Sequence, residues 1–179
     1  MRINTRLAQG TFNRQLSPVE QAAAQLVPQA VSIALSIREL IRQGYLFSAG
    51  LLLRPLIERV GTVEYLRLHP DAVAAWHAGW PRKEQPCLQE LLEATSQAEA
   101  ASADELKSFA NMLHKLIHPD PTGGLWNMII HENGTPAFSS GKIFDDPQLC
   151  DFVSVTACRF LVLAMRIAED VFKPVGSGA

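Results

Sequence analysis

The chain of 179 residues has few cysteines, few aromatic residues and no excess of either charge. Its three cysteines, Cys87, Cys150 and Cys158, match no metal-binding or disulfide spacing. The last two are expected on one helix, about 12 Å apart at a rise of about 1.5 Å per residue, which is too far for a disulfide. We therefore expect reduced thiols and a cytoplasmic protein.

The balance of charge limits the partners that the chain can attract. Lys and Arg number 16 and Asp and Glu number 18, so the formal net charge is −2. Binding to RNA is therefore not supported by net charge. The one basic region is an expected flexible N-terminal arm, residues 1–16, in which all three charged side chains are arginines: Arg2, Arg6 and Arg14.

Long hydrophobic runs are also lacking. Arg38, Arg54 and Arg159 interrupt the longest apolar segments, so none reaches the roughly 18 residues of a membrane span. No N-terminal stretch has the pattern of a signal peptide. The hydrophobic content of 47% is nevertheless sufficient for one sizeable core. These features predict a single domain that does not enter a membrane.

Several catalytic and cofactor motifs are missing. The chain has no glycine-rich phosphate loop, dinucleotide fingerprint, Ser-His-Asp order or cysteine-nucleophile signature. We therefore expect no cofactor.

Helix signals, by contrast, are strong. Ser17 and Glu20 form a capping box, with Pro18 at the first helical position, and begin a helix that ends near Gln43. Pro28 within this helix predicts a kink or a break near Gln25. A second helix is predicted from Tyr45 to Leu68. It is apolar on nearly every side, which is typical of a central helix packed by several neighbours.

Proline also marks this second helix, because Pro55 should bend it beside Arg54 and leave the carbonyl of Leu51 without its normal donor. Further helices are predicted at 70–80, 87–97, 102–118 and 148–172, and residues 173–179 should be disordered. Asn133 and Gly134 suit either a hairpin turn between 128–130 and 137–138 or a structured loop. The sum is an all-α, single-domain bundle of five or six helices over residues 17–172, with an irregular segment before the last helix.

Two pairs of ionisable residues interrupt the apolar helices. Arg54 and Glu58 lie one helical turn apart, and unpaired charges among leucines would cost several kcal/mol. They form either a structural ion pair or a site in which Arg54 presents its guanidinium to an anion and Glu58 orients it.

His114 and His118 are the second pair, again one turn apart. This spacing suits a divalent metal if Glu58 or Asp120 adds an oxygen. His118 alternatively caps the end of its helix, where an imidazole favours the helix dipole.

Trp76 and Trp80 also follow helical spacing. Core or interface packing is the simpler interpretation, and an aromatic ligand platform is the alternative. Apolar helices with these tryptophans nearby also suggest that the protein forms a homodimer.

The segment from Ser48 to Glu58, Ser-Ala-Gly-Leu-Leu-Leu-Arg-Pro-Leu-Ile-Glu, resembles a group of bacterial helical proteins with an Arg-x-x-x-Glu helix. Their downstream helix end is matched by Leu113-His-Lys-Leu-Ile-His-Pro119. The group is placed near the HEPN superfamily, many of whose members are ribonucleases or toxin partners. The resemblance covers residues 31–121 and implies a HEPN-like bundle.

The chain departs from the HEPN ribonuclease motif, in which an arginine and a histidine act on the RNA 2′-hydroxyl and phosphate without metal. No arginine precedes His118 or His114 at the required spacing, and Lys107 is the nearest substitute. The resemblance first implies an interaction module or a defence or toxin–antitoxin module, with Arg54, Glu58 and His118 as one polar cluster. The alternatives are a metal-independent ribonuclease using His118 and Arg54, and a metal-binding hydrolase using His114 and His118.

Overall fold

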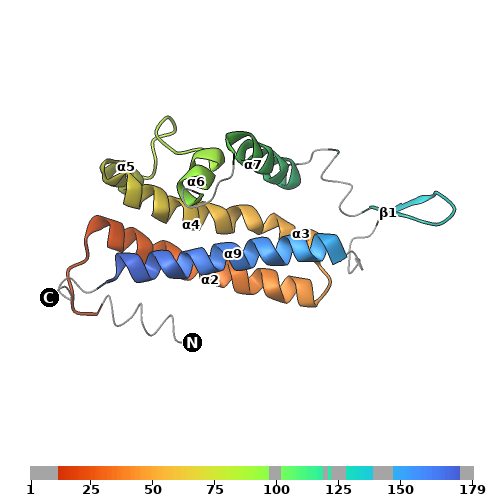
Figure 1. Cartoon of the computed structure of the whole chain (residues 1–179), viewed down its shortest axis with the longest axis horizontal. Coiled ribbons are helices and arrows are strands. Elements are labelled where there is room, and N and C mark those ends of the chain that lie inside the picture. Colours follow the sequence, from red (N-terminus) through yellow and green to blue (C-terminus); the bar gives the residue numbers. More distant parts are fainter. Residues whose placement is uncertain (1–11, 97–101, 119–120, 122–127, 139–146, 174–179) are drawn as a thin grey trace.

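Three long helices run side by side along the molecule (Figure 1). They are α2 (Pro18–Arg42), α4 (Leu53–Leu68) and α9 (Pro147–Val171). The computed structural model describes residues 12–96, 102–118, 121, 128–138 and 147–173. Most of the described structure is helical and only two short strands are present in it, so the predicted all-α bundle is confirmed.

The central helix is α4. It packs against α2 and α9 on one side and against α6 (Leu88–Thr95) on the other, and it also touches α7 (Ala103–Ile117). Figure 1 shows α5, α6 and α7 on the opposite side of α4 from α9. The core includes Ile37, Leu53, Leu113 and Phe160, one residue from each of α2, α4, α7 and α9. The expectation that the segment around Arg54 forms a helix packed on several sides is therefore correct.

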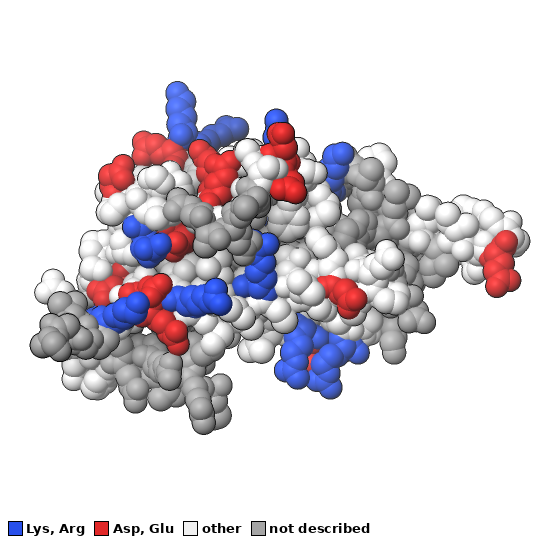
Figure 2. All heavy atoms as spheres, viewed as in Figure 1, with Lys and Arg blue, Asp and Glu red and all other residues white. Residues whose placement is uncertain are grey.

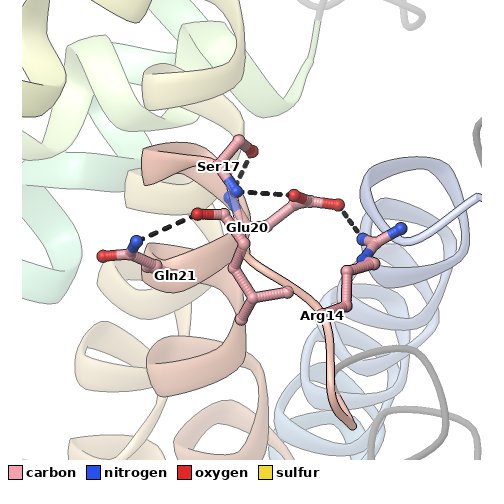
Figure 3. Close-up of polar contacts among 5 residues, drawn as sticks. Arg14, Ser17, Glu20 and Gln21 are labelled. Carbon is pink, nitrogen blue, oxygen red and sulfur yellow. Dashed lines mark hydrogen bonds and ion pairs between the residues drawn. The ribbon is translucent and has the colours of Figure 1, made fainter.

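The first helix begins as its sequence predicts. The backbone N–H of Ser17 donates to the Glu20 carboxylate at 2.7 Å, and the Glu20 N–H donates to Ser17 Oγ at 3.3 Å (Figure 3). Arg14 pairs with the same carboxylate, so this part of the expected arm contacts α2. The rest of that arm, residues 1–11, lies outside the described residues.

Of the kink or break predicted near Gln25, the break is wrong, because α2 continues through Pro28 to Arg42. Pro28 is exposed, so the carbonyl of Ala24 that loses its donor lies within reach of water. The adjacent residues Val27 and Ala30 are buried in the core. Their packing holds the helix together on the inner side.

The predicted second helix is divided at Leu52 into α3 (Leu46–Leu51) and α4. The Leu52 N–H donates to the carbonyl of Ala49 at 3.2 Å, a tightened last turn. Pro55 is then the third residue of α4, where a missing N–H leaves no bond unmade. In place of the bend expected at Pro55, the helix is interrupted at Leu52, three residues earlier.

The shortest helices lie between α4 and α6. A 3₁₀ turn (η1, Pro70–Ala72) leads into α5 (Val73–His77), which ends before the Trp80 limit expected from sequence. The Gly79 N–H donates to the Trp76 carbonyl at 3.0 Å and the Trp80 N–H to the Ala75 carbonyl at 2.9 Å. This is a Schellman ending, with Gly79 at the left-handed position at φ +86°.

The uncertain segment before the last helix contains the predicted hairpin. Strands β1 (Met128–Ile130) and β2 (Pro136–Phe138) pair antiparallel, with Ile130 opposite Pro136. Gly134 has φ +78°, which fits a short loop ending in a left-handed residue. The hairpin projects from one end of the bundle (Figure 1).

The last two long helices follow their predicted bounds. In α7 the backbone N–H of Ser102 donates to Glu105, and this bond, with one from the Ser102 hydroxyl, lowers the pKa of Glu105. The cap therefore stabilises α7 at neutral pH and is lost as the pH falls through that lowered pKa. Residues 139–146 and the predicted tail from 174 onward lie outside the described residues.

Among the described helices, α9 is long and apolar enough, by length and composition alone, to cross a membrane. From the sequence, no membrane-spanning segment is expected here, because Arg159 interrupts the apolar run. A core helix of a soluble protein meets the same criterion. In this structure α9 buries Val153, Phe160 and Ile167 against the rest of the bundle.

The contact between α4 and α6 depends on Gly61. A Cβ atom added to Gly61 would lie 2.8 Å from the Leu91 Cβ and 3.2 Å from the Leu91 carbonyl oxygen. Real Cβ atoms do not approach that closely, so the two helices would have to move apart. Glycine at this position therefore sets how near α6 lies to the central helix.

We expect Gly61→Ala to lower the free energy of unfolding by about 1–3 kcal/mol, the usual cost of overpacking. In open space the same change would raise it by about 1 kcal/mol through helix propensity, so the sign of the effect is diagnostic. Urea denaturation measures it. Ser36→Ala, on the exposed face of α2, is the control and should change stability by less than about 0.5 kcal/mol. A stabilised Gly61→Ala variant would contradict the close contact.

Candidate functional site

A cleft of about 710 Å³ opens beside α4, on the side away from α9. Its walls come from α2, α4, α5, α6, α7 and the connection between α5 and α6. Leu26 and Gln29 of α2 form one edge, and Ala110, Asn111 and His114 of α7 form another. The cleft therefore exists only where these separate elements are brought together.

Polar residues of α4 line the cleft along one stripe. Arg54, Glu58 and Thr62 follow each other at intervals of one helical turn, and Arg59 lies beside them. The other faces of α4 carry buried residues such as Leu53, which pack against the neighbouring helices. The stripe that lines the cleft is thus the face of α4 that its neighbours leave partly uncovered.

Arg54 connects this stripe to α7. Its Nε donates to Glu58 Oε1 at 2.8 Å, and its Nη1 lies 3.3 Å from His114 Nδ1. Because a guanidinium only donates, a hydrogen bond in this contact uses the lone pair of Nδ1 as the acceptor. The structure therefore brings together Arg54, Glu58 and His114.

His118 stands one step further out. It caps the C-terminus of α7, where its N–H donates to the His114 carbonyl at 3.2 Å. The His114 and His118 rings lie with centroids 4.2 Å apart, tilted by 50°. His118 is not among the described residues that line the cleft, and its link to Arg54 runs through His114. Of the three predicted residues, Arg54 and Glu58 are therefore in direct contact, and His118 is connected to them through His114.

Metal binding by the histidine pair finds little support in this geometry. Within the described parts of the chain no group of three or more His, Cys, Asp or Glu side chains converges. The Nδ1 atom of His114 faces a guanidinium, and a second cation there would be repelled. Asp120, proposed as an oxygen ligand, lies outside the described residues.

Positive charge dominates the cleft. Its described lining contains Arg54, Arg59, Arg82 and Lys107 but only one carboxylate, that of Glu58. Neither Arg82 nor Lys107 forms an ion pair with a described residue. On the face drawn in Figure 2, by contrast, basic and acidic side chains are interspersed among uncharged ones. The cationic surplus is therefore local, in a chain whose net charge is −2.

Sequence reasoning missed most of this surplus. Arg59 follows Glu58 directly, and nothing in its sequence position distinguishes it from an ordinary surface arginine. Arg82 sits in a charged linker with Lys83 and Glu84 close by, so nothing marks it out. Lys107 is the nearest substitute for the missing arginine of the HEPN motif. It precedes His114 by two helical turns and so lies on the same face of the helix.

The two tryptophans pack against the core and also line the cleft. Trp76 and Trp80 pack against a small hydrophobic cluster of Ala22, Leu66 and Val73. Both are only half-buried, and both also line the cleft. Each indole therefore has one part in the fold and another part facing the open space.

Comparison of the chain with models of protein families, with curated proteins and with solved structures finds no match.

The exposure of the Arg54–Glu58 pair decides how much it can stabilise the bundle. The side chains are 24% and 36% exposed, so water screens their attraction. Exposed pairs of this kind contribute less than about 1 kcal/mol. The pair therefore adds little to the free energy of unfolding of the bundle.

We expect Arg54→Gln and Glu58→Gln each to lower the free energy of unfolding by less than about 1 kcal/mol. Leu53→Ala, at the fully buried neighbouring position, should lower it by about 2–5 kcal/mol. Urea denaturation of the three variants measures the difference. If Arg54→Gln costs as much as Leu53→Ala, the pair is a structural brace.

Proposed function

We propose that this chain is a HEPN-like helical domain that binds a multiply charged anion in the cleft, as part of an interaction or defence-associated module. The observation that supports the proposal is the set of four basic side chains around the cleft with a single carboxylate among them. The HEPN-like relationship itself is proposed from the Arg54-x-x-x-Glu58 helix and the helix end at His118.

Electrostatics favours an anion in this position. Folding places Arg54, Arg59, Arg82 and Lys107 around one space, where they repel each other. An anion with several negative oxygens would relieve that repulsion and accept paired hydrogen bonds from the guanidinium groups. Glu58 holds Arg54 through its Nε and His114 lies against Nη1, which leaves Nη2 of Arg54 to donate to a ligand.

A cytoplasmic homodimer that captures a protein partner remains part of this proposal. Leu35 of α2 and Val155 and Val162 of α9 expose apolar side chains that a second copy or a partner could cover.

Inorganic pyrophosphate is a suitable probe for the cleft, with isothermal titration calorimetry as the measurement. We expect Arg82→Gln and Lys107→Gln each to weaken binding roughly threefold to tenfold, because a partly exposed charge contact contributes on the order of 1 kcal/mol. Glu58→Gln should strengthen binding by a similar factor, since it removes the one negative charge. Added salt should weaken binding in all variants.

Arg42→Gln is the matched control for these substitutions. Arg42 pairs with Glu39 near the end of α2, about 20 Å along the helix from Gln29 at the cleft. Its removal should leave the affinity for pyrophosphate unchanged. Absence of pyrophosphate binding, or equal weakening by Arg42→Gln, would contradict an anion site in the cleft.

A second candidate function is metal-independent cleavage of RNA, and the contact between Arg54 and His114 favours it. When the Arg54 guanidinium turns to a phosphate, the Nδ1 lone pair of His114 is released. His114 then takes the proton of the ribose 2′-hydroxyl, whose oxygen bonds to phosphorus, while the 5′-oxygen leaves and takes up a proton from water to become a 5′-hydroxyl. Arg54 stabilises the negative charge that develops on the phosphate.

This second function predicts cleavage of single-stranded RNA in the presence of EDTA. His114→Ala should reduce the rate by about 100-fold or more, the usual loss of an acid–base group. His118→Ala should reduce it less, because His118 meets the site only through the His114 ring. Gel analysis of a labelled oligonucleotide measures both. Equal activity of His114→Ala and the unaltered protein would exclude this mechanism.

A further inference from the structure

We infer that the ligand of this cleft is a nucleotide, whose base stacks on the indoles of Trp76 and Trp80 and whose phosphates contact the basic side chains. The inference rests on the proposed anion site and specifies its ligand. It starts from a division within the cleft: aromatic and apolar side chains stand beside a group of cations.

The aromatic part is built from two indoles on neighbouring positions of the fold. Trp76 is on α5, and Trp80 lies in the turn that closes the end of that helix. Trp80 is held by Tyr65, whose ring meets it edge-on with centroids 6.3 Å apart. Because both indoles are half-buried against the core, their orientation is set before any ligand arrives. Planar, preset aromatic surfaces suit the face of a base.

The backbone at Trp80 adds a second observation. Trp80 has φ +51°, a strained conformation that a bulky L-residue rarely adopts. Glycine at this position would avoid the strain. The chain nevertheless places an indole there, at the wall of the cleft. Strain of this kind is more often found at ligand sites than in ordinary loops.

The cationic part requires more than one negative charge. Arg54 and Arg59 come from α4, Arg82 from the connection before α6, and Lys107 from α7. A single carboxylate can satisfy one or two of these groups, whereas a chain of phosphates reaches several. The volume of about 710 Å³ is within the usual range for small-ligand sites, about 300–1,000 Å³. A base joined to phosphates meets the aromatic and the charged requirement together.

The test compares ATP with inorganic tripolyphosphate, which carries the same phosphate chain without a nucleoside. Titration calorimetry should show ATP binding on the order of 10-fold to 100-fold more tightly, the contribution of a base stacked on an aromatic side chain. Adenosine alone should bind far more weakly than ATP, since it lacks the charged groups.

Substitution of Trp76 separates stacking from charge. Trp76→Leu should remove most of the advantage of ATP over tripolyphosphate, and Trp76→Phe should retain much of it because phenylalanine still offers a ring. The affinity for tripolyphosphate should stay unchanged in both variants, which also shows that the cleft has folded. An unchanged ATP advantage in Trp76→Leu would overturn the assignment of the base to this wall.

The outcomes distinguish this inference from the proposed function. If tripolyphosphate binds and ATP binds no more tightly, the nucleotide assignment is wrong while the anion site stands. If neither binds, both are wrong. A short 5′-phosphorylated RNA that displaces ATP identifies the end of an RNA strand as a source of the nucleotide. Binding of ATP without displacement by that RNA identifies a free nucleotide as the ligand.

Discussion

The packing of α4 on almost every side is the constraint on which the rest of this structure depends. Leu53, Ile57 and Val60 are buried against neighbouring helices, and Gly61 lets α6 approach as closely as backbone atoms allow. A helix enclosed in this way cannot place charges at random, because most directions lead into a core. Arg54, Glu58 and Thr62 lie on one polar stripe of α4, and that stripe becomes the floor of the cleft.

Within that stripe, the ion pair acts on orientation more than on stability. A pair as exposed as Arg54 and Glu58 contributes little to folding. It does fix the direction of the guanidinium, since Nε is used by Glu58 while Nη1 reaches His114 on another helix. A side chain with many rotamers thereby loses much of its freedom before a ligand is present, and ordering it on binding then costs less.

The parts of the fold that were predictable are those decided by local chemistry. Ser17 and Ser102 mark helix starts because their side chains cap the first backbone N–H groups. Pro55, which has no N–H, indicates that the helical segment around it is interrupted, and it lies in the first turn of α4. The cleft was only half predictable. Arg54 stood out against its leucine neighbours, whereas Arg82 and Lys107 look like ordinary surface charges until folding brings them beside it. Such convergence is a property of tertiary packing and leaves no periodic signal in the sequence.

Because the walls of the cleft come from six regions between Leu26 and His114, the cleft is lost whenever any one of them separates. Whatever binds there binds the folded chain and not its unfolded or partly opened forms. A ligand at 100 times its dissociation constant would therefore add about 2.7 kcal/mol to the free energy of unfolding. The occupancy of the cleft would then govern how long the chain survives proteolysis in a cell, and the level of ligand would set the level of the protein.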